Sequence, residues 1–402
     1  MRGLHGSNLV AMRSACLFVA LFWASMDMAA QCDGLRFRYR VFDNVEVTTG
    51  VFYGANTGSS GANVELDMDI YRPAGDSSTN RPAVVLAHGG FFLAGSNDGV
   101  DVVPLCEDLA RMGYVAASIS YRLGIDNVFD LETSLQESVL RGVHDAKAAV
   151  RYFRRTHAED GNPWGIDPAR IVLGGSSAGA FIALHAAYID DMEEVPDIID
   201  LTQPGLGGGL EGLSGNPGYS SEVLSIVNIS GAMGDADWIA EGDVPILSTH
   251  GTSDGTVPYG TGTISLLGVN VAEVDGSWPV HIRAAEVGLD HRFVTFEGAG
   301  HVPHMNNATY YDLTRAAVTG FTSRQVCPAY ANVPDYYDVD DPPAVGCQGD
   351  LDFDGSVAVT DMLTLLSSYG CVESCVGDVN GDGLVTVTDV LNLLGLFGTP
   401  CG

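Results

Sequence analysis

Strand-like and helix-like segments alternate along most of this chain, and this alternation constrains the fold more than any other feature of the sequence. Short apolar or β-branched runs are repeatedly followed by apolar residues at helical spacing. The expected strands cover 37–47, 64–71, 83–87, 115–119, 171–173, 226–229, 245–248 and 293–296, and the expected helices cover 139–153, 178–188 and 309–321. Such an order predicts an α/β fold, in which a mostly parallel sheet carries helices on both faces.

The N-terminus has the organisation of a secretory signal peptide. Arg2 and Arg13 precede the apolar run 15–24, and small residues end at Ala30, after which we predict cleavage. The apolar run is too short to span a membrane, and no later segment reaches the about 18 uninterrupted apolar residues that a transmembrane helix needs. We therefore expect a soluble, secreted protein that is extracellular or part of a cell-surface complex, with no transmembrane segment.

Two segments depart from the alternating order. Residues 190–221 are acidic and then rich in glycine, and we interpret them as a loop or lid over the carboxyl edge of the sheet. Residues 328–346 are rich in Pro, Asp and Tyr without apolar periodicity, which is typical of a linker. The chain thus divides into a signal peptide at 1–30, an α/β domain at 31–327, a linker at 328–346 and a small C-terminal module at 347–402.

Acidic residues far outnumber basic ones. The chain has 51 Asp and Glu against 19 Lys and Arg, which gives a formal net charge of −32 at pH 7. A surface of this charge repels phosphate backbones and anionic lipid headgroups, so nucleic acid is excluded as a partner. Such acidity suits either cation binding or simple solubility, and the positions of the acidic residues decide between the two.

An internal repeat with an offset of 28 residues occupies the C-terminal module. Each copy has acidic or amide residues at loop positions 1, 3 and 5, Gly at position 6 and Asp at position 12, ahead of an apolar helix. Calcium takes about six to eight oxygen ligands around such a turn, with a backbone carbonyl at position 7. The predicted calcium ligands are Asp350, Asp352, Asp354, Ser356 and Asp361 in the first copy, and Asp378, Asn380, Asp382, Leu384 and Asp389 in the second.

The two loops end in Asp rather than Glu, and one helix follows each loop. In these respects the module resembles dockerins, which fold on structural calcium and dock onto cohesin-like partners through their repeated helices. Loop positions 10 and 11 are nearly identical in the two copies, which fits docking in either orientation. Seven cysteines remain once the signal peptide is removed, so one stays free or pairs with another chain. We predict Cys347–Cys401 and Cys371–Cys375 bridges, and we leave the pairing of Cys32, Cys106 and Cys327 open.

The G-x-S-x-G turn at 175–179 carries the strongest chemical signal. It follows a short β-branched strand and opens a helix. Its glycines permit the sharp strand-to-helix turn that raises a serine hydroxyl above a sheet. We predict that Ser177 is a nucleophile at a helix N-terminus, where backbone N–H groups can stabilise an oxyanion.

A second glycine turn, His88-Gly89-Gly90-Phe91-Phe92, follows the expected strand at 83–87. Glycine at this point lets the backbone N–H of Gly90 or Phe91 approach a carbonyl oxygen, and the N–H of Ala178 would complete the oxyanion hole. His88 and Phe92 are predicted to contact the substrate.

A serine hydroxyl needs a base to take its proton and a carboxylate to orient that base. Asp254 and His301 each lie in a loop after an expected strand, and the chain order Ser177, Asp254, His301 is the one expected of α/β-hydrolases. The alternatives that remain are His304 for the base and Asp237 or Asp290 for the acid.

The combined motifs resemble the α/β-hydrolase carboxylesterases, and the feruloyl/acetyl-xylan-esterase-like branch most closely. The motifs are His88-Gly-Gly, Ser120-Tyr-Arg122, Asp145-Ala-Lys-Ala-Ala-Val-Arg151, Gly165-Ile-Asp-Pro168 and Gly175-Ser-Ser-Ala-Gly179. The resemblance spans about residues 40–322 and implies an eight-stranded sheet and ester hydrolysis through an acyl-enzyme, without a catalytic cofactor. Phe91 departs from it, because many relatives have a third glycine there.

The resemblance and the expected export together favour a secreted serine esterase that acts on short acyl or feruloyl esters of plant or algal polysaccharide. One alternative is a lipase, polyesterase or peptidase on the same scaffold. A remoter one is a catalytically silent adhesion protein. Acyl and alcohol specificity, the docking partner and the oligomeric state are left open.

Overall fold

The computed structural model describes residues 32–125, 127, 129–266, 269–330, 349–351, 356–371, 377–380 and 384–398. The expected signal peptide and most of the expected linker lie outside these residues. Residues 40–326 form one compact unit, and a second unit takes in the described residues 32–39, 327–330 and those from 349 onward. No described helix has both the length and the apolar character needed to cross a bilayer.

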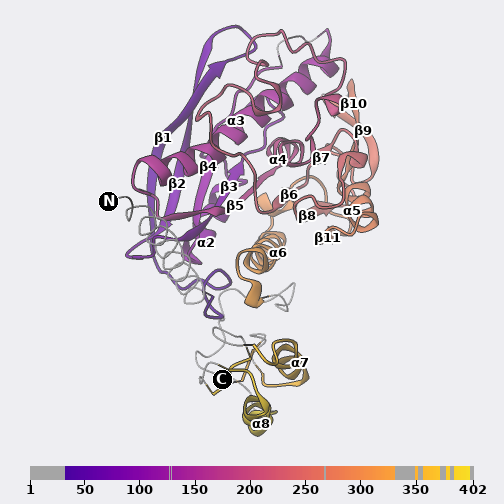
Figure 1. The fold of residues 1–402 in the computed structure, drawn as a ribbon. Helices are drawn as coiled ribbons and strands as arrows, with labels where there is room; N and C mark the ends of the chain where they lie inside the picture. Colours follow the sequence, from indigo (N-terminus) through magenta and orange to yellow (C-terminus); the bar gives the residue numbers. More distant parts are fainter. Residues whose placement is uncertain are drawn as a thin grey trace, which may run out of the picture. The chain divides into compact units, whose positions relative to one another are not determined.

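Eight of the described strands form one sheet in the order β1-β2-β4-β3-β5-β6-β8-β11 (Figure 1). β1 and β2 pair antiparallel, as do β2 and β4, and every other neighbouring pair is parallel. This confirms the predicted α/β fold with a mostly parallel sheet. The strands are β1 (Val45–Thr57), β2 (Asn63–Pro73), β3 (Arg81–Ala87), β4 (Val115–Ile119), β5 (Ile166–Ser176), β6 (Ile226–Ile229), β8 (Ile246–Gly251) and β11 (His291–Phe296).

Helices cover both faces of this sheet. α2 (Val103–Arg111) connects β3 to β4 in one direction across the sheet, and α3 (Leu131–Glu159) connects β4 back to β5 in the other. Right-handed crossovers that run in opposite directions place their helices on opposite faces. α4 (Ala178–Tyr188) packs beside α3, whereas α6 (Ala308–Val326) packs beside α2 (Figure 1). The apolar core therefore lies in two layers, one on each side of the sheet.

A second sheet of three described strands was not predicted from the sequence. β9 (Thr261–Leu266) and β10 (Val269–Gly276) form a hairpin, and β10 also pairs with β7 (Ala232–Met233). α5 (Ser277–Glu286) follows β10 and packs against it and against β11. The hairpin strands alternate buried and exposed residues instead of forming a continuous apolar run, so they lack the signal that marks the central parallel strands.

Residues 190–221, interpreted as a loop or lid, lie along α3. They contain two short 3-10 helices, η1 (Met192–Glu194) and η2 (Gly209–Glu211). Side chains of α3 hold the segment by its main-chain carbonyl groups. Arg141 donates to the carbonyl of Pro204, His144 to that of Gly209, and Arg151 to those of Glu211 and Gly215.

The other unit contains a disulfide between Cys32 and Cys327, whose Cα atoms are 5.8 Å apart. Two further short 3-10 helices of the 40–326 unit are η3 (Ala236–Trp238) and η4 (Pro303–Met305), and η5 (Pro328–Tyr330) follows Cys327. Cys106 is buried and free, which decides the pairing that the sequence left open. Cys371 is also in a disulfide, and the remaining cysteines of the predicted bridges lie outside the described residues.

The C-terminal repeat has one described helix in each copy, α7 (Val359–Ser367) and α8 (Val387–Leu396). Its small core is built from residues that recur at the 28-residue offset. They are Leu351 with Val379, Val357 with Val385, and Leu365 with Leu393. Sequence repetition is thus matched by repeated packing, as expected for a module with internal pseudo-symmetry.

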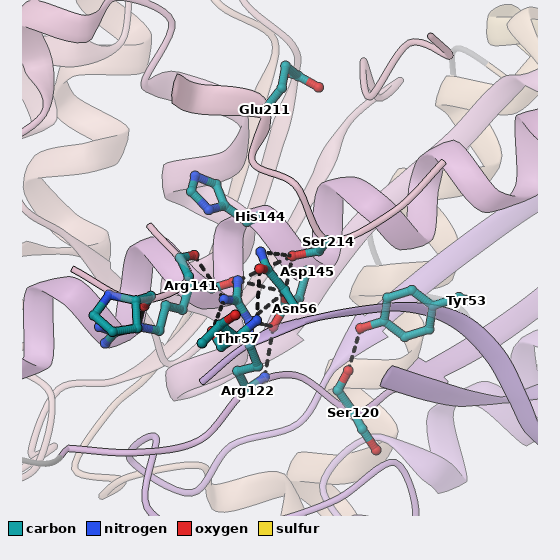
Figure 2. A network of polar contacts seen from close by, with 12 residues as sticks. Tyr53, Asn56, Thr57, Ser120, Arg122, Arg141, His144, Asp145, Glu211 and Ser214 are labelled. Atoms are coloured by element: carbon teal, nitrogen blue, oxygen red, sulfur yellow. Dashed lines mark hydrogen bonds and ion pairs between the residues drawn. The ribbon is translucent and has the colours of Figure 1, made fainter. Parts of the chain in front are cut away.

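The 40–326 unit also contains a fully buried ion pair, Arg122 with Asp145 (Figure 2). Arg122 Nε lies 2.9 Å from both carboxylate oxygens of Asp145, and neither side chain is exposed to solvent. The other guanidinium N–H groups donate to the carbonyl oxygens of Thr57, Arg141 and Gly205 and to Ser214 Oγ. The charge is therefore compensated and every nitrogen is hydrogen-bonded, which is the condition for burying an ion pair without a large penalty.

We predict that Asp145→Ala lowers the free energy of unfolding by about 3–5 kcal/mol, because it leaves the Arg122 charge buried without a counter-ion. The matched control is Glu46→Ala, which breaks the exposed Arg72–Glu46 pair and is expected to cost less than about 1 kcal/mol. Urea unfolding of the full chain, followed by tryptophan fluorescence, measures both. Equal effects of the two substitutions would contradict the structural role assigned to the buried pair.

Candidate active site

Ser177 lies at the turn between β5 and α4, at the N-cap of α4. Its backbone is left-handed, with φ of 52° and ψ of −116°. A non-glycine residue in such a conformation is strained by roughly 1–3 kcal/mol and must be held by its surroundings. Here the Ser177 N–H donates to the carbonyl of Ile229 on β6, at 2.8 Å. A Cβ at Gly175 would overlap the backbone of Gly179, and one at Gly179 would overlap that of Ala87, so both flanking glycines are required by close approach.

The structure brings the three predicted triad residues together. Ser177 Oγ lies 2.8 Å from His301 Nε2, and His301 Nδ1 lies 2.6 Å from Asp254 Oδ2. Asp254 follows β8 and His301 follows β11, which are parallel neighbours in the sheet. The carboxyl ends of neighbouring parallel strands meet at one edge, so loops far apart in the sequence converge there. The arrangement can pass a proton from the serine to the imidazole while the carboxylate holds the ring.

The carboxylate of Asp254 is buried and heavily hydrogen-bonded. Burial alone would raise its pKa, but hydrogen bonds from His250 and His301 and from the backbone N–H of Val257 outweigh that effect and hold the pKa well below its usual range. Asp254 Oδ1 also accepts the N–H of Thr256 at 2.8 Å. The residue therefore stays ionised near neutral pH, as is needed to stabilise a protonated imidazole.

The rival residues lie elsewhere. His304 is buried, and its Nε2 donates to the carbonyl of Asp101 at 3.0 Å. Asp237 is largely exposed near Arg283, and Asp290 accepts a hydrogen bond from Gln325 at the surface. None of these side chains is hydrogen-bonded to the Ser177–His301 pair.

The predicted oxyanion loop adjoins the serine, and its backbone is unusual. Gly90, Phe91 and Phe92 all have positive φ, at 120°, 58° and 59°. Glycine adopts a positive φ freely, whereas a residue with a bulky side chain is strained by it. Phe91 is therefore strained at the position where many relatives have a third glycine. Within the described chain, the N–H groups of Gly90, Phe91 and Ala178 donate to no protein acceptor. Each of these residues lines at least one of the two hollows at Ser177. They are available to an oxyanion.

His88 is not where the sequence suggested. It was predicted to contact substrate, but the residue is only 1% exposed and its ring stacks on Tyr121, with ring centroids 4.4 Å apart. Its Nδ1–H donates to the carbonyl of Gly89, at 2.5 Å, and burial lowers the pKa of the ring. His88 thus shapes the loop from behind and lines neither cavity at the serine, whereas Phe92 does line the pocket.

Sequence reasoning missed two residues that support this loop. Asp101 Oδ2 accepts the N–H of Gly89 at 2.6 Å, and the Tyr121 hydroxyl donates to the carbonyl of His88 at 2.9 Å. Tyr121 stands in the Ser-Tyr-Arg motif that carried part of the resemblance, so the motif could have pointed to it. No local sequence pattern indicates the role of Asp101. That role depends on the chain after β3 folding back so that the Asp101 carboxylate reaches the N–H of Gly89.

Two hollows flank Ser177. An open cleft of about 370 Å³ is lined by Asp101, His301 and Met305, among others. A small apolar pocket of about 20 Å³ lies beside Ala178 and Phe92. Ser177 and Phe91 line both, so Phe91 stands at the boundary between them. A substrate bound across the serine could place one portion in each.

The predicted calcium ligands are described only in part. Asp352, Asp354 and Asp382 lie outside the described residues, and within the described ranges no group of three or more His, Cys, Asp or Glu side chains forms a metal site. The other predicted ligands lie within the described residues. They are Asp350, Ser356 and Asp361 in the first copy and Asp378, Asn380, Leu384 and Asp389 in the second.

The position-12 carboxylates are buried and share two backbone contacts between the copies. Asp361 accepts the N–H groups of Leu351 and Ala358, at 2.6 and 2.7 Å. Asp389 accepts those of Val379 and Thr386, at 3.0 and 2.9 Å. Each carboxylate therefore ties loop positions 2 and 9 to the start of the following helix.

The sheet order, the serine turn between β5 and α4, and an acid and a base after the last two parallel strands define an α/β-hydrolase fold. The BD-FAE family model matches residues 68–232, a span that includes Ser177 and ends before Asp254 and His301. Together with the fold, this match supports a hydrolase that acts on ester bonds.

Other similar proteins include esterases. The propionate-bound esterase 2 of the planctomycete Thermogutta terrifontis is 23% identical, with 69% of this chain and 93% of that chain covered and a TM-score of 0.48. A truncated carbohydrate esterase from gut microbiota is 20% identical, with 71% and 98% covered and a TM-score of 0.46. The non-reducing polyketide synthase pkbA of Emericella nidulans is 32% identical over 126 residues, which is 31% of this chain and only 5% of that protein.

We predict that Asp254→Asn slows covalent labelling of Ser177 by a fluorophosphonate probe by about three to four orders of magnitude, since an amide favours the wrong tautomer of His301. Labelling rates at pH 7 and circular dichroism of the variant provide the measurement. Asp237→Asn is the control and should label at the wild-type rate. A normal rate for Asp254→Asn, or a slowed one for Asp237→Asn, would mean that the acid has been misassigned.

Proposed function

We propose that this protein is a secreted serine carboxylesterase that hydrolyses its substrate through an acyl-enzyme. The observation that carries the proposal is the hydrogen-bonded series from Ser177 through His301 to Asp254, next to the available N–H groups of Gly90, Phe91 and Ala178. Nucleophile, base, orienting acid and oxyanion donors are the complete set of groups that acyl transfer needs.

In the first step, Ser177 Oγ bonds to the ester carbonyl carbon while its proton passes to His301 Nε2. The carbonyl oxygen becomes an oxyanion that accepts hydrogen bonds from the N–H of Ala178 and from that of Gly90 or Phe91. The bond from carbon to the alcohol oxygen then breaks, and that oxygen takes the proton from His301. A water molecule next gives a proton to His301 and attacks the acyl carbon, so that the acid leaves and Ser177 regains its proton.

The expected export and the C-terminal module favour a polysaccharide-linked ester, with a short acyl or feruloyl group, as the substrate. The cleft of about 370 Å³ at Ser177 is open to solvent and offers room for the alcohol portion of a large substrate. An open cleft suits a polymer, because the chain can extend beyond the enzyme on both sides of the ester. This assignment rests on resemblance and on the size of the cleft, since fold does not determine substrate.

We also propose that the C-terminal repeat is a dockerin-like module that binds structural calcium. The carboxylate and amide side chains at loop positions 1, 3 and 5 are hard oxygen donors, the type that calcium prefers. The hydrogen bonds that Asp361 and Asp389 both accept from loop positions 2 and 9 support two similar loops, each closed onto its helix. Bound calcium would supply the charge that lets several carboxylates share one small loop.

Repeated apolar side chains on the two helices favour a protein partner such as a cohesin. On each helix they stand at spacing i, i+4 and i+7, which places them on one face. These residues, between 50% and 63% exposed, are Val359, Leu363 and Leu366 on α7 and Val387, Leu391 and Leu394 on α8. An apolar face that recurs at the repeat offset is expected where either copy can dock.

Ser177→Ala is expected to abolish hydrolysis of a short-chain aryl ester, with kcat reduced by about 10⁶-fold, because the acyl-enzyme cannot form. The neighbouring Ser176→Ala is a matched control, since the Ser176 hydroxyl is buried without a hydrogen-bond partner. Acid release from acetylated xylan and from feruloylated arabinoxylan then tests the substrate. Full activity of Ser177→Ala would refute the mechanism, whereas cleavage of the aryl ester alone would refute only the polysaccharide assignment.

Chelation of calcium in the full chain should lower the melting temperature of the C-terminal module and leave esterase activity unchanged. Calorimetric titration should find two calcium sites per chain. Asp378→Ala removes a position-1 ligand and should leave one site, and Asp200→Ala, on an exposed turn of the other unit, is the control. Melting and circular dichroism that do not respond to chelation would rule out the calcium assignment.

A further inference from the structure

A second imidazole faces the carboxylate of Asp254. His250 is fully buried, and its Nε2 lies 3.2 Å from Asp254 Oδ2. The same nitrogen lies 3.2 Å from the carbonyl oxygen of Val257. Asp254 Oδ2 is also the oxygen that accepts the Nδ1–H of His301, at 2.6 Å. Two histidines therefore share one oxygen of the triad carboxylate, and the acyl-transfer steps use only one of them, His301.

The other oxygen of Asp254 is held by the backbone. Oδ1 accepts the N–H groups of Thr256 and Val257, at 2.8 and 2.9 Å, in the turn that follows β8. These two bonds fix one edge of the carboxylate and so fix the direction in which Oδ2 points. The attraction of Oδ2 for the proton of His301 then depends on its second donor, His250, because the negative charge of the oxygen is divided between the two N–H groups.

Ser277, at the start of α5, fixes the tautomer of His250. Ser277 Oγ lies 2.8 Å from His250 Nδ1, and Asn228 Nδ2 donates to the same Oγ at 3.0 Å. The hydroxyl therefore donates its own proton to Nδ1, and Nε2 carries the proton of the ring. The other neutral tautomer would place an unprotonated Nε2 against two acceptors, Asp254 Oδ2 and the carbonyl of Val257, with no proton between them.

Further polar contacts hold this arrangement from behind. Asn228 Nδ2 also donates to Ser248 Oγ, and Asn228 Oδ1 accepts the N–H of Gly231, both at 2.9 Å. The carbonyl of Gly231 is a more distant acceptor for the Ser277 hydroxyl, at 3.4 Å against 2.8 Å for His250. All four side chains of this network are fully buried. A buried polar network whose members are paired keeps each of them in one geometry.

Several elements present ionisable side chains to the two imidazoles. They are Asp254 and Tyr259 after β8, His304 on η4 and, across the open cleft, Asp101. Burial is the main cause that lowers the pKa of His304, so this ring is neutral near pH 7. α5 and β6 present the uncharged Ser277 and Asn228 to His250. Asp254 is thus the charge that contacts both imidazoles, and a change at His250 reaches His301 through it.

We propose that His250 is a positioning residue that weakens the hold of Asp254 on the proton of His301. Its Nε2–H takes part of the negative charge of Oδ2, so protonated His301 is stabilised less than it would be by an undivided carboxylate. His301 thereby stays able to accept the proton of Ser177 down to a more acidic pH. The inference rests on the proposed function, because it takes Ser177 and His301 as nucleophile and base, and it adds what sets the acidic limit of their reaction.

The test measures the rate of labelling of Ser177 by a fluorophosphonate probe on the full chain, between about pH 5 and pH 9. His250→Leu removes the donor and should move the acidic midpoint of this profile upward by about 0.5–1 pH unit, as expected when one hydrogen bond to the carboxylate is lost. His250→Gln keeps an N–H donor near the position of Nε2 and should return the midpoint to within about 0.3 pH unit of wild type.

Thr249→Val is the matched control and should leave the profile unchanged, because Thr249 is the buried neighbour of His250 on β8 and its hydroxyl has no hydrogen-bond partner. Ser277→Ala is a second variant in case His250→Leu does not fold. It frees the tautomer of His250 and should move the midpoint upward by a smaller amount. A general loosening of the site would instead weaken the contact between Asp254 and His301 and move the midpoint downward, so the direction of the shift separates the two causes.

Hydrolysis of 4-nitrophenyl acetate, measured alongside, separates this proposal from the esterase proposal. If the ester is hydrolysed but the folded variants at His250 or Ser277 show an unchanged or lowered midpoint, the role of His250 is refuted and the esterase stands. Failure of His250→Gln to restore the midpoint refutes that role as well. If labelling follows the expected shifts while the ester is not hydrolysed, the esterase proposal fails and the role of His250 stands. If Ser177 is not labelled at any pH, both proposals fail.

Discussion

The buried ion pair between Arg122 and Asp145 holds together three segments of the 40–326 unit that are far apart in the sequence (Figure 2). Removing both charges from water costs several kcal/mol per ion, and the structure offsets this cost because every guanidinium nitrogen is hydrogen-bonded. Through those bonds the end of β1, the middle of α3 and the 190–221 segment share one anchor.

A second constraint is the crowded turn at Ser177, where the backbone is strained at the residue that carries the nucleophile. The left-handed backbone of Ser177 is compensated by its hydrogen bond to Ile229 and by helix α4, which starts immediately after it. The positive φ of Phe91 is likewise held by its surroundings, because Asp101 and Tyr121 hydrogen-bond to the loop that carries it. Strained residues on a rigid scaffold keep the reacting groups in place before substrate arrives.

The two units of the chain differ in the size of their cores and in what stabilises them. The 40–326 unit has a large core and positions its site by tertiary contacts between distant loops. The C-terminal repeat has only a small core of paired residues, and a chain of that size usually needs a metal or disulfides to fold. The acidic loops and the disulfide-bonded Cys371 are consistent with that need. We propose that one unit performs the reaction and the other binds calcium and recruits a partner.

Local features of this protein could be predicted from the sequence alone. The α/β alternation, the serine turn and the 28-residue repeat each depend on neighbouring residues, so short-range spacing is enough to identify them. Tertiary structure alone decided that His301 and not His304 faces Ser177, that Cys32 pairs with Cys327, and that the β9–β10 hairpin helps to enclose a cavity. These outcomes depend on contacts between residues far apart in the chain, and no local pattern encodes which distant surfaces will meet.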